Sequence, residues 1–303
     1  MATRTSVTSG NYRADNADTW GLGLNNYPAT GDDVVIANGT TVTLAQNENA
    51  NSLTIASGGT IVGAGYEITI DGEDSSGFAV NNDGTISGNL DLEINTQAST
   101  TCDFNGTSGN FQNVKLNHAS VDVHIGGDTT FDGNLTIAAG TFDCSNEGGS
   151  SRNLTVTGQI SIASGATLNC NASTITNGSA SSSASDFDPA GNLTLGSCTF
   201  KFFCGSSSNI YLGDATLASN TSTLELIGRQ TFSNRDMDFS TSSGNLHNLT
   251  VTKTGSVTSG FRLTHNTTIG GNLTIETGAT LDTNTSNKSL TVTGAIDCVG
   301  NLT

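Results

Sequence analysis

Short stretches of alternating apolar and polar residues recur along almost the whole chain. Most begin with Asn or Ser, continue with an aliphatic residue and Thr, and end on a second aliphatic residue. Such alternation is typical of a β-strand with one buried face, and Asn and Ser favour the turn before it. The pattern therefore predicts one supersecondary unit that is stacked many times. The eleven copies begin at Ser52, Asn89, Asn113, Asn134, Asn153, Asn192, Asn209, Asn248, Asn272, Ser289 and Asn301.

Glycine-centred turns separate these strands from second strands. Residues 56–60, 138–141, 163–167 and 276–280 are variants of one such corner, and the distances between copies predict about 14 coils of about 17 to 24 residues. This variable spacing argues against a strict hexapeptide repeat, and parallel strands are normally joined by right-handed connections. We therefore predict an all-β fold, a right-handed parallel β-helix (β-solenoid) with a short non-repeating N-terminal cap. A pair of antiparallel β-sandwiches is the alternative fold.

The first thirty residues do not follow the repeat. Residues 1–30 contain the only Trp, Trp20, and the tyrosines Tyr12 and Tyr27. Because an open solenoid end must be covered, we predict that 1–30 form a cap and that these three aromatic residues attach the chain to a partner. The solenoid is predicted in two halves, 31–176 and 191–303, with a Ser-rich loop at 177–190 between them.

The charge balance excludes some classes of partner. Ten Lys and Arg residues against 27 Asp and Glu residues give a net charge of −17, which is unsuited to binding nucleic acid or an anionic membrane surface. No apolar run reaches the roughly 20 residues that span a bilayer, and the first residues lack the apolar core of a secretory signal. We therefore expect synthesis and assembly in the cytoplasm, with no membrane insertion.

The six cysteines are spread along the chain without a Cys-x-x-Cys pair. Each lies two positions from an apolar residue, and side chains two apart on a strand point the same way. All six thiols are therefore predicted to be buried, although a disulfide between stacked coils stays open. No cofactor or metal site is predicted. A metal site at His118, Asp122 and His124 would require an unbroken strand, and a turn between them would destroy the alignment.

Acidic residues two positions apart are the candidates for an enzyme active site. On a β-helix, carboxylates on neighbouring coils could act as general acid and base. The least easily dismissed group is Arg235, Asp236 and Asp238, although surface ion pairs explain it more simply. In turns, Asp is favoured for local hydrogen bonds, so most of these acids are expected to be structural. The acids considered are Asp32 with Asp33, Asp71 with Glu73 and Asp74, Asp122, Asp186 with Asp188, and Asp236 with Asp238.

The stretch of residues 20–36 is similar to a segment of a known class of proteins. The stretch from Trp20 through Pro28 to Gly31-Asp32-Asp33-Val34-Val35-Ile36, followed by Asn-Leu-Thr-Ile coils, resembles the beginning of virion proteins of tailed bacteriophages. That resemblance implies a fibre, spike or capsid-decorating role on a parallel β-helix. No catalytic residues carry over, since no depolymerase motif is matched.

We therefore expect a non-enzymatic structural and binding subunit of a phage virion appendage or head decoration. Its expected partners are other virion proteins and two further copies in a homotrimer, with host surface glycans as a ligand class and no nucleic acid. The expected location is the virion, assembled in the host cytoplasm. The alternatives are a polysaccharide lyase or hydrolase, and a bacterial surface adhesin or filament subunit.

Overall fold

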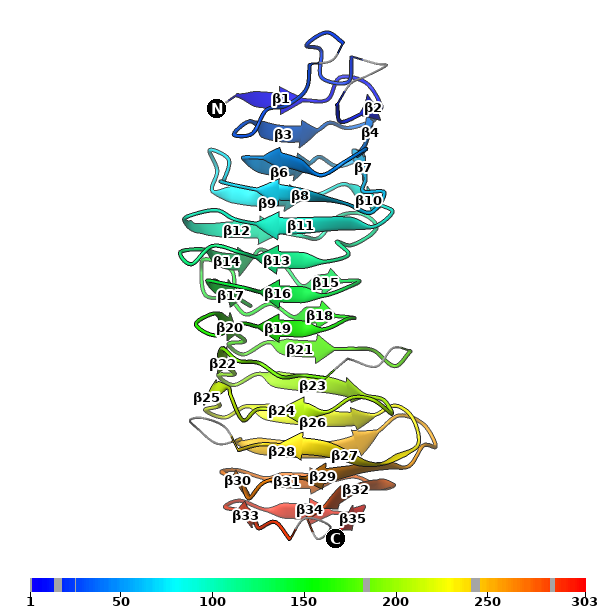
Figure 1. The fold of residues 1–303 in the computed structure, drawn as a ribbon, viewed down its shortest axis with the longest axis vertical. Coiled ribbons are helices and arrows are strands. Elements are labelled where there is room, and N and C mark those ends of the chain that lie inside the picture. The colour runs from blue at the N-terminus through cyan, green and yellow to red at the C-terminus, as the bar shows by residue number, and fades with distance from the viewer. Residues whose placement is uncertain (1, 14–17, 25, 182–185, 241–245, 284–286) are drawn as a thin grey trace. The chain divides into compact units, whose positions relative to one another are not determined.

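The computed structural model describes the chain apart from residues 1, 14–17, 25, 182–185, 241–245 and 284–286. It divides into two compact units, Met1–Ser150 and Ser151–Thr303. The described residues form strands and no helix, and the strands within each unit stack in parallel (Figure 1). This arrangement confirms the predicted parallel β-helix and excludes the antiparallel sandwiches.

The first unit contains three stacks of parallel strands and one further strand, β15 (Thr129–Phe131). One stack runs β1 (Thr3–Thr5), β3 (Asp33–Ile36), β6 (Ser52–Ile55), β9 (Phe78–Asn82), β12 (Ser99–Asp103), β14 (Asp122–Ile125) and β17 (Thr141–Asp143). The second runs β2 (Gly10–Asn11), β4 (Thr41–Thr43), β7 (Thr60–Val62) and β10 (Thr85–Ser87). The third runs β5 (Glu48–Ala50), β8 (Tyr66–Ile70), β11 (Leu90–Ile94), β13 (Val114–Leu116) and β16 (Leu135–Ile137).

The second unit is built in the same way, with β19 (Ile160–Ile162) as a further strand. Its longest stack runs β18 (Leu154–Val156), β21 (Thr174–Asn177), β23 (Thr199–Cys204), β26 (Thr223–Gly228), β28 (Asn248–Lys253), β31 (Leu273–Ile275) and β34 (Ile296–Cys298). A second runs β24 (Ile210–Tyr211), β27 (Phe232–Asp238), β29 (Ser259–Leu263), β32 (Ala279–Asp282) and β35 (Asn301–Leu302). Two short stacks are β20 (Thr167–Asn169), β22 (Asn192–Thr194) and β25 (Thr216–Ala218), and β30 (Thr267–Ile269) with β33 (Leu290–Val292).

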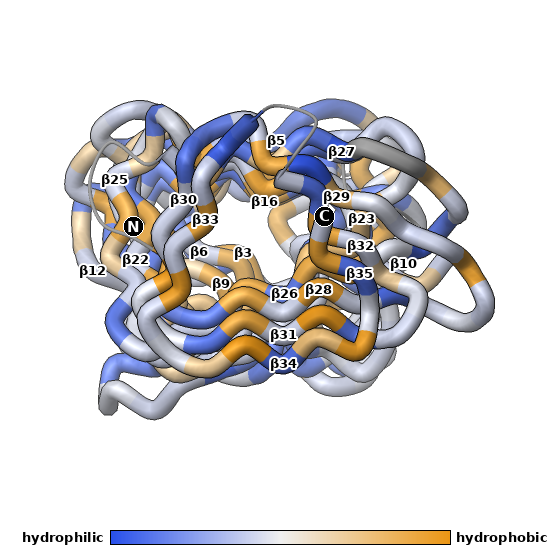
Figure 2. The backbone as a smooth tube through the Cα atoms, turned by 90° about the horizontal axis from the view of Figure 1, so that it is seen from below, coloured by the Kyte–Doolittle hydropathy of each residue, from blue (hydrophilic) through white to orange (hydrophobic). Residues whose placement is uncertain are grey.

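The winding of the second unit is right-handed. Figure 2 looks at it from the C-terminal end, and the chain passes from β31 to β32 on the right, then to β33 on the left, and returns to β34 below β31. This path is counter-clockwise while the chain advances toward the viewer. The predicted handedness therefore holds for this unit.

The pairing between strands corrects the predicted length and the predicted number of the coils. Val114 lies beside Leu135 and Leu249 beside Leu273, which gives coils of 21 and 24 residues, but Leu53 lies beside Val80, 27 positions on. The motifs at Asn192 and Asn209 are not on successive coils, because Leu193 pairs with Leu217 while Ile210 pairs with Met237. One coil therefore carries more than one copy of the motif. The described strands accordingly make about ten turns instead of the predicted 14.

The asparagine that opens many strands bonds to the next coil. The backbone N–H of Asn134 donates to Asn113 Oδ1 at 2.9 Å, and that of Asn272 donates to Asn248 Oδ1 at 2.9 Å. The same bond joins Ala295 N to Asn272 Oδ1 at 2.9 Å and Thr174 N to Asn153 Oδ1 at 2.8 Å. An amide at this position thus satisfies a backbone donor one coil away, which explains why the motif begins with Asn.

Inward-facing apolar side chains form the core of each unit. In the first unit, Phe104 contacts Phe111 and Phe131 edge to face, and Phe131 contacts Phe142 in the same way. In the second, Phe187 stacks on Phe200 with ring centroids 5.2 Å apart. Burying each such ring stabilises the fold by about 1.5–3 kcal/mol.

The cysteine prediction is correct for five thiols and wrong for one. Cys102, Cys144, Cys170, Cys198 and Cys204 are buried, and the six cysteines are thiols that form no disulfide in the described structure. Cys298 is exposed. It lies beside the inward-facing Ile275 of β31, as the alternation predicts, but β34 is an edge strand, and no strand of the described residues pairs with its other edge. Ile296 on the same strand is also 54% exposed.

The segment predicted as a Ser-rich loop, 177–190, lies within the second unit. Asn177 is the last residue of β21, and residues 182–185 lie outside the described part of the chain. Phe187 is buried and bridges to Ile210. The end of this segment is therefore a strand-like part of the coil.

Candidate functional site

The aromatic residues predicted for attachment lie in the cap of the first unit, and two of them are buried. Tyr12 is 0% and Trp20 is 4% exposed. Their rings meet edge to face at 5.4 Å, and Trp20 Nε1 donates to the Tyr12 carbonyl at 2.6 Å. Burial, reinforced by Glu48, raises the pKa of Tyr12. These two side chains hold the cap together and are not accessible to a partner.

Tyr27 is 37% exposed and is fixed by Arg13. Arg13 donates to the Tyr27 hydroxyl at 2.6 Å, and its guanidinium lies 4.3 Å from the centre of the Tyr27 ring. The same guanidinium binds both oxygens of Glu48, at 2.8 and 2.9 Å. Of the three predicted attachment residues, Tyr27 is the one that a partner could touch.

Asp32 and Asp33 are bonded within the protein. Asp32 accepts hydrogen bonds from Arg4 Nε at 3.0 Å and from the backbone N–H groups of Ala2 and Ala29. Asp33 Oδ1 accepts from the side chains of Asn51 and Ser52. Asp74 likewise accepts from backbone N–H groups in its own turn. These carboxylates are therefore held by the protein's own groups, although Asp33 is the first residue of β3 and does not lie in a turn.

His124 and Asp122 face outward together on β14, with Nε2 and Oδ2 3.5 Å apart. His118 does not join them: its Nδ1 accepts the backbone N–H of Ser120. Within the described part of the chain, no three His, Cys, Asp or Glu side chains are grouped closely enough to hold a metal ion.

Three short segments of the second unit bring the other acidic pairs together. Phe187 bridges to Ile210, and Ile210 pairs with Met237. All three side chains are buried, so the residues on either side of each face outward from adjacent coils, about 4.8 Å apart. We call these outward residues the Tyr211 face: Asp186, Asp188, Asn209, Tyr211, Asp236 and Asp238.

Specific partners fix the carboxylates of the Tyr211 face. Asn209 donates to Asp186 Oδ1 through its backbone N–H at 2.8 Å and its side chain at 3.1 Å. Arg262, one coil further on, donates to Asp236 Oδ1 through Nη2 and, at 2.9 Å, through Nε. Arg262, and not Arg235, is therefore the ion-pair partner of Asp236.

Asp238 is the least exposed carboxylate of the Tyr211 face. Its side chain is 15% exposed, and its Oδ1 accepts from Ser240 N at 2.8 Å and Ser240 Oγ at 2.5 Å. His265 Nδ1 lies 3.0 Å from the same oxygen. Asp238 is thus held in one orientation by two neighbours.

Tyr211 lies between acidic residues. It pairs with Asp238 on one side, and its backbone N–H donates to the Phe187 carbonyl on the other. Burial raises the pKa of Tyr211, and the charges of Asp236, Asp186 and Asp188 raise it further, whereas Arg235 lowers it. The phenol is therefore protonated at neutral pH and able to donate a hydrogen bond.

Arg235 differs from the other cations near this face. Its Nε is buried and has no hydrogen-bond partner in the described structure. A buried guanidinium N–H normally has an acceptor, so this atom is an unsatisfied donor within the described structure, and the register of Arg235 with the inward-facing Phe261 places it away from Asp236 and Asp238.

Sequence reasoning identified the two Asp pairs but missed what joins them. Asn209, Tyr211, Arg262 and His265 come from other coils, and their positions depend on the strand register. A signal was present, since 186–188, 209–211 and 236–238 each place one apolar residue between two polar ones.

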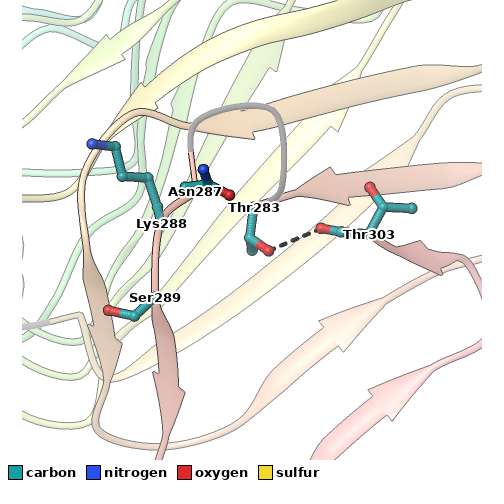
Figure 3. A pocket seen from close by; sticks show the side chains of 5 residues that line it. All are labelled: Thr283, Asn287, Lys288, Ser289 and Thr303. Atoms are coloured by element: carbon teal, nitrogen blue, oxygen red, sulfur yellow. Dashed lines mark hydrogen bonds between the residues drawn. The ribbon is translucent and has the colours of Figure 1, made fainter.

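An open hollow lies on the last coils of the second unit (Figure 3). Thr283 Oγ1 donates to the Thr303 carbonyl at 2.9 Å across it. Its other lining residues are Asn287, Lys288 and Ser289.

The described residues contain no helix that is long and apolar enough to cross a bilayer.

Comparison with known proteins gives no match to a family model, a curated protein sequence or a solved structure. The function must therefore be argued from the chain itself.

Proposed function

We propose that this protein is a non-enzymatic structural and binding subunit, a β-solenoid carried on the appendage or head of a tailed-phage virion. The observation that supports this most is the regular scaffold, in which side chains from successive coils are held in fixed register. The outward asparagine bonds add to this regularity, because they tie backbone groups of adjacent coils together. The resemblance of residues 20–36 supports the virion setting.

Mass spectrometry of purified virions, followed by cryo-microscopy with an antibody to the cap, tests this proposal. The protein should be present in the particle in many copies and labelled at its surface. Absence from purified particles would overturn the virion setting. Neighbouring genes for secretion, in place of terminase and portal genes, would favour the adhesin alternative.

The alternative of a polysaccharide lyase or hydrolase has one specific observation in its favour. The Tyr211 face brings four carboxylates together on neighbouring coils, with a protonated phenol between them. An enzyme of this kind should release reducing ends or unsaturated products from a panel of capsular and acidic polysaccharides, and Asp238→Asn should abolish the release. Absence of product across the panel would exclude this alternative.

A further inference from the structure

We infer that the Asn105-Gly106 peptide of the first unit is a site of spontaneous covalent modification, at which the Asn105 side chain loses ammonia and becomes aspartate or isoaspartate. This inference is independent of the proposed function. The reaction needs an asparagine followed by a residue whose backbone nitrogen is accessible, and glycine suits it because no Cβ shields that nitrogen. The chain contains three such pairs, Asn38-Gly39, Asn105-Gly106 and Asn177-Gly178.

The modification proceeds in two steps, with water as the only co-reactant. The Gly106 nitrogen gives its proton to solvent hydroxide and attacks Cγ of Asn105. A bond from this nitrogen to Cγ forms, the Cγ–Nδ2 bond breaks, and the side-chain nitrogen takes a proton from water and leaves as ammonia. Water then opens the cyclic imide. Attack at Cγ gives aspartate, whereas attack at the backbone carbonyl gives isoaspartate, in which the main chain runs through Cβ and Cγ.

Both reacting groups of Asn105-Gly106 are free. The pair lies just after β12, and Asn105 is exposed. In the described structure, no protein group forms a hydrogen bond with the Asn105 side chain or with the Gly106 backbone N–H. The backbone N–H of Asn105 donates to Asp103 Oδ1 at 3.1 Å, which holds the segment without occupying either reacting group. The reaction therefore requires no local unfolding at this site.

Asn38 is a matched comparison within the same chain, because Asn38-Gly39-Thr40 has the same three residues as Asn105-Gly106-Thr107. Asn38 is exposed as well, but the Gly39 backbone N–H donates to the Gly58 carbonyl on the next coil at 3.0 Å. This hydrogen bond must break before the nitrogen can lose its proton and attack. The fold therefore slows the reaction at Asn38 and leaves it unhindered at Asn105.

Asn177 is protected more completely. Its side chain is buried, and Nδ2 donates to the carbonyls of Val156 at 3.2 Å and Gly158 at 2.6 Å. The Gly178 backbone N–H also donates to the Val156 carbonyl, at 2.8 Å. Because the preceding coil holds both reacting groups, we expect Asn177 to react more slowly than Asn38.

Isoaspartate adds one atom to the main chain of a closely packed segment. A Cβ added at Gly106 would lie 2.4 Å from the Gly84 carbonyl oxygen and 2.5 Å from Asn82 Nδ2. The backbone N–H of Thr107 donates to the same Gly84 carbonyl at 2.5 Å. A longer main chain must displace these groups, since the interior leaves no spare volume. The modified chain should therefore be less stable than the fresh chain.

Peptide mapping by mass spectrometry on the full chain tests the inference. The folded chain is incubated at neutral and mildly alkaline pH in water enriched in oxygen-18, so that only conversion during the incubation is counted. We expect Asn105 to be converted at least about tenfold faster than Asn38, since the hydrogen bond at Gly39 must first be broken. Both rates should rise with pH. In the urea-unfolded chain the two sites should react at similar rates, because their sequences match.

Asn105→Gln is the control variant, because its longer side chain would have to close a six-membered ring, which forms much more slowly. It should show no conversion at that position and keep its urea midpoint after incubation, whereas the midpoint of the unchanged protein should fall. Equal rates at Asn105 and Asn38 in the folded chain, or a faster reaction at Asn38 or Asn177, would overturn the inference. So would an Asn105 that is converted in the unfolded chain alone.

Discussion

At the scale of single residues, the asparagine that opens the repeat forms hydrogen bonds to neighbouring coils. Asn113 joins three coils: its Oδ1 accepts from Asn134 N at 2.9 Å, and its Nδ2 donates to Asp91 Oδ1 at 2.9 Å. Asp91 also accepts from the Asn113 backbone N–H at 3.2 Å. The side chain thus serves the same purpose as a helix cap, because it satisfies a backbone donor at the start of a strand.

Replacing Asn113 with Ala should lower the free energy of unfolding by about 1–2 kcal/mol, since it removes two hydrogen bonds between coils, of which the one to Asp91 is partly buried. Urea denaturation followed by circular dichroism measures the change. Asn110→Ala is the control, because Asn110 donates one exposed hydrogen bond to Asp132 and should cost less than about 0.5 kcal/mol. Equal losses in the two variants would contradict a special role for the strand-opening asparagine.

The carboxyl group of Asp32 makes the stability of the cap depend on pH. Burial alone would raise the pKa of Asp32, but the hydrogen bonds from Arg4, Ala29 and Ala2 outweigh it and hold the pKa below its ordinary value. A carboxyl with a lowered folded pKa stabilises the fold above its unfolded pKa of about 3.9, and this stabilisation is lost as the pH falls through the folded pKa.

Asp32→Asn should therefore be less stable than the unchanged protein at pH 7, by roughly 1–3 kcal/mol, and the difference should shrink below about pH 4. Denaturation midpoints at a series of pH values measure both effects, with Asp214→Asn as a control outside the cap. A difference that stays constant down to acid pH would show that the charge of Asp32 is not responsible.

At the scale of strands and turns, the close spacing of coils restricts particular glycines. Gly109 has a φ of +75°, and a Cβ added there would lie 1.9 Å from the backbone oxygen of Ile86 on the preceding coil. Gly149 has the same φ but has no atom within 4 Å of its added Cβ. The pair therefore separates the cost of the backbone conformation from the cost of the clash.

Gly149→Ala should cost about 1–2 kcal/mol, because an L side chain is disfavoured at positive φ. Gly109→Ala should cost about 1–3 kcal/mol more, since the backbone of the neighbouring coil must also move. Thermal or urea unfolding of both variants gives the comparison. Equal costs would mean that the coils separate easily at this turn.

At the scale of the whole molecule, exposed apolar residues gather away from the sides of the coils. Within the described residues, the large hydrophobic side chains that are exposed lie in two places. In the cap they are Val7, Leu22, Leu24 and Tyr27, and on the last coil Ile296, Val299 and Leu302. Association through an apolar surface would therefore involve one of these places more readily than the polar coil sides.

If the chain forms the homotrimer expected from its sequence, light scattering should give a native mass near three times the chain mass of 30.8 kDa. If the cap forms the contact, Leu24→Asp should reduce that mass to the monomer value, while Tyr66→Ala on β8 should leave it unchanged. A monomeric mass for the unchanged protein at high concentration would contradict the trimer.

The strands, the parallel stacking and most of the inward-facing positions could be predicted from the amino-acid sequence. These features follow from local alternation, and alternation fixes which face of each strand is buried. The alternation along each strand predicted that the side chains of Cys204 and Cys298 face inward. It could not predict that Cys298 is exposed, because exposure depends on what packs against β34. Burial is a property of neighbours that are distant in sequence.

The tertiary structure alone decided which copies of the repeat lie beside one another. Asn192 and Asn209 look like successive copies in the sequence, but they lie in different sheets, and Ile210 meets Phe187 and Met237 instead. The physical reason is that turns of different lengths consume different numbers of residues, so the register depends on how every turn packs. The Tyr211 face exists because of that register, and alternation along a single strand could not have assembled it.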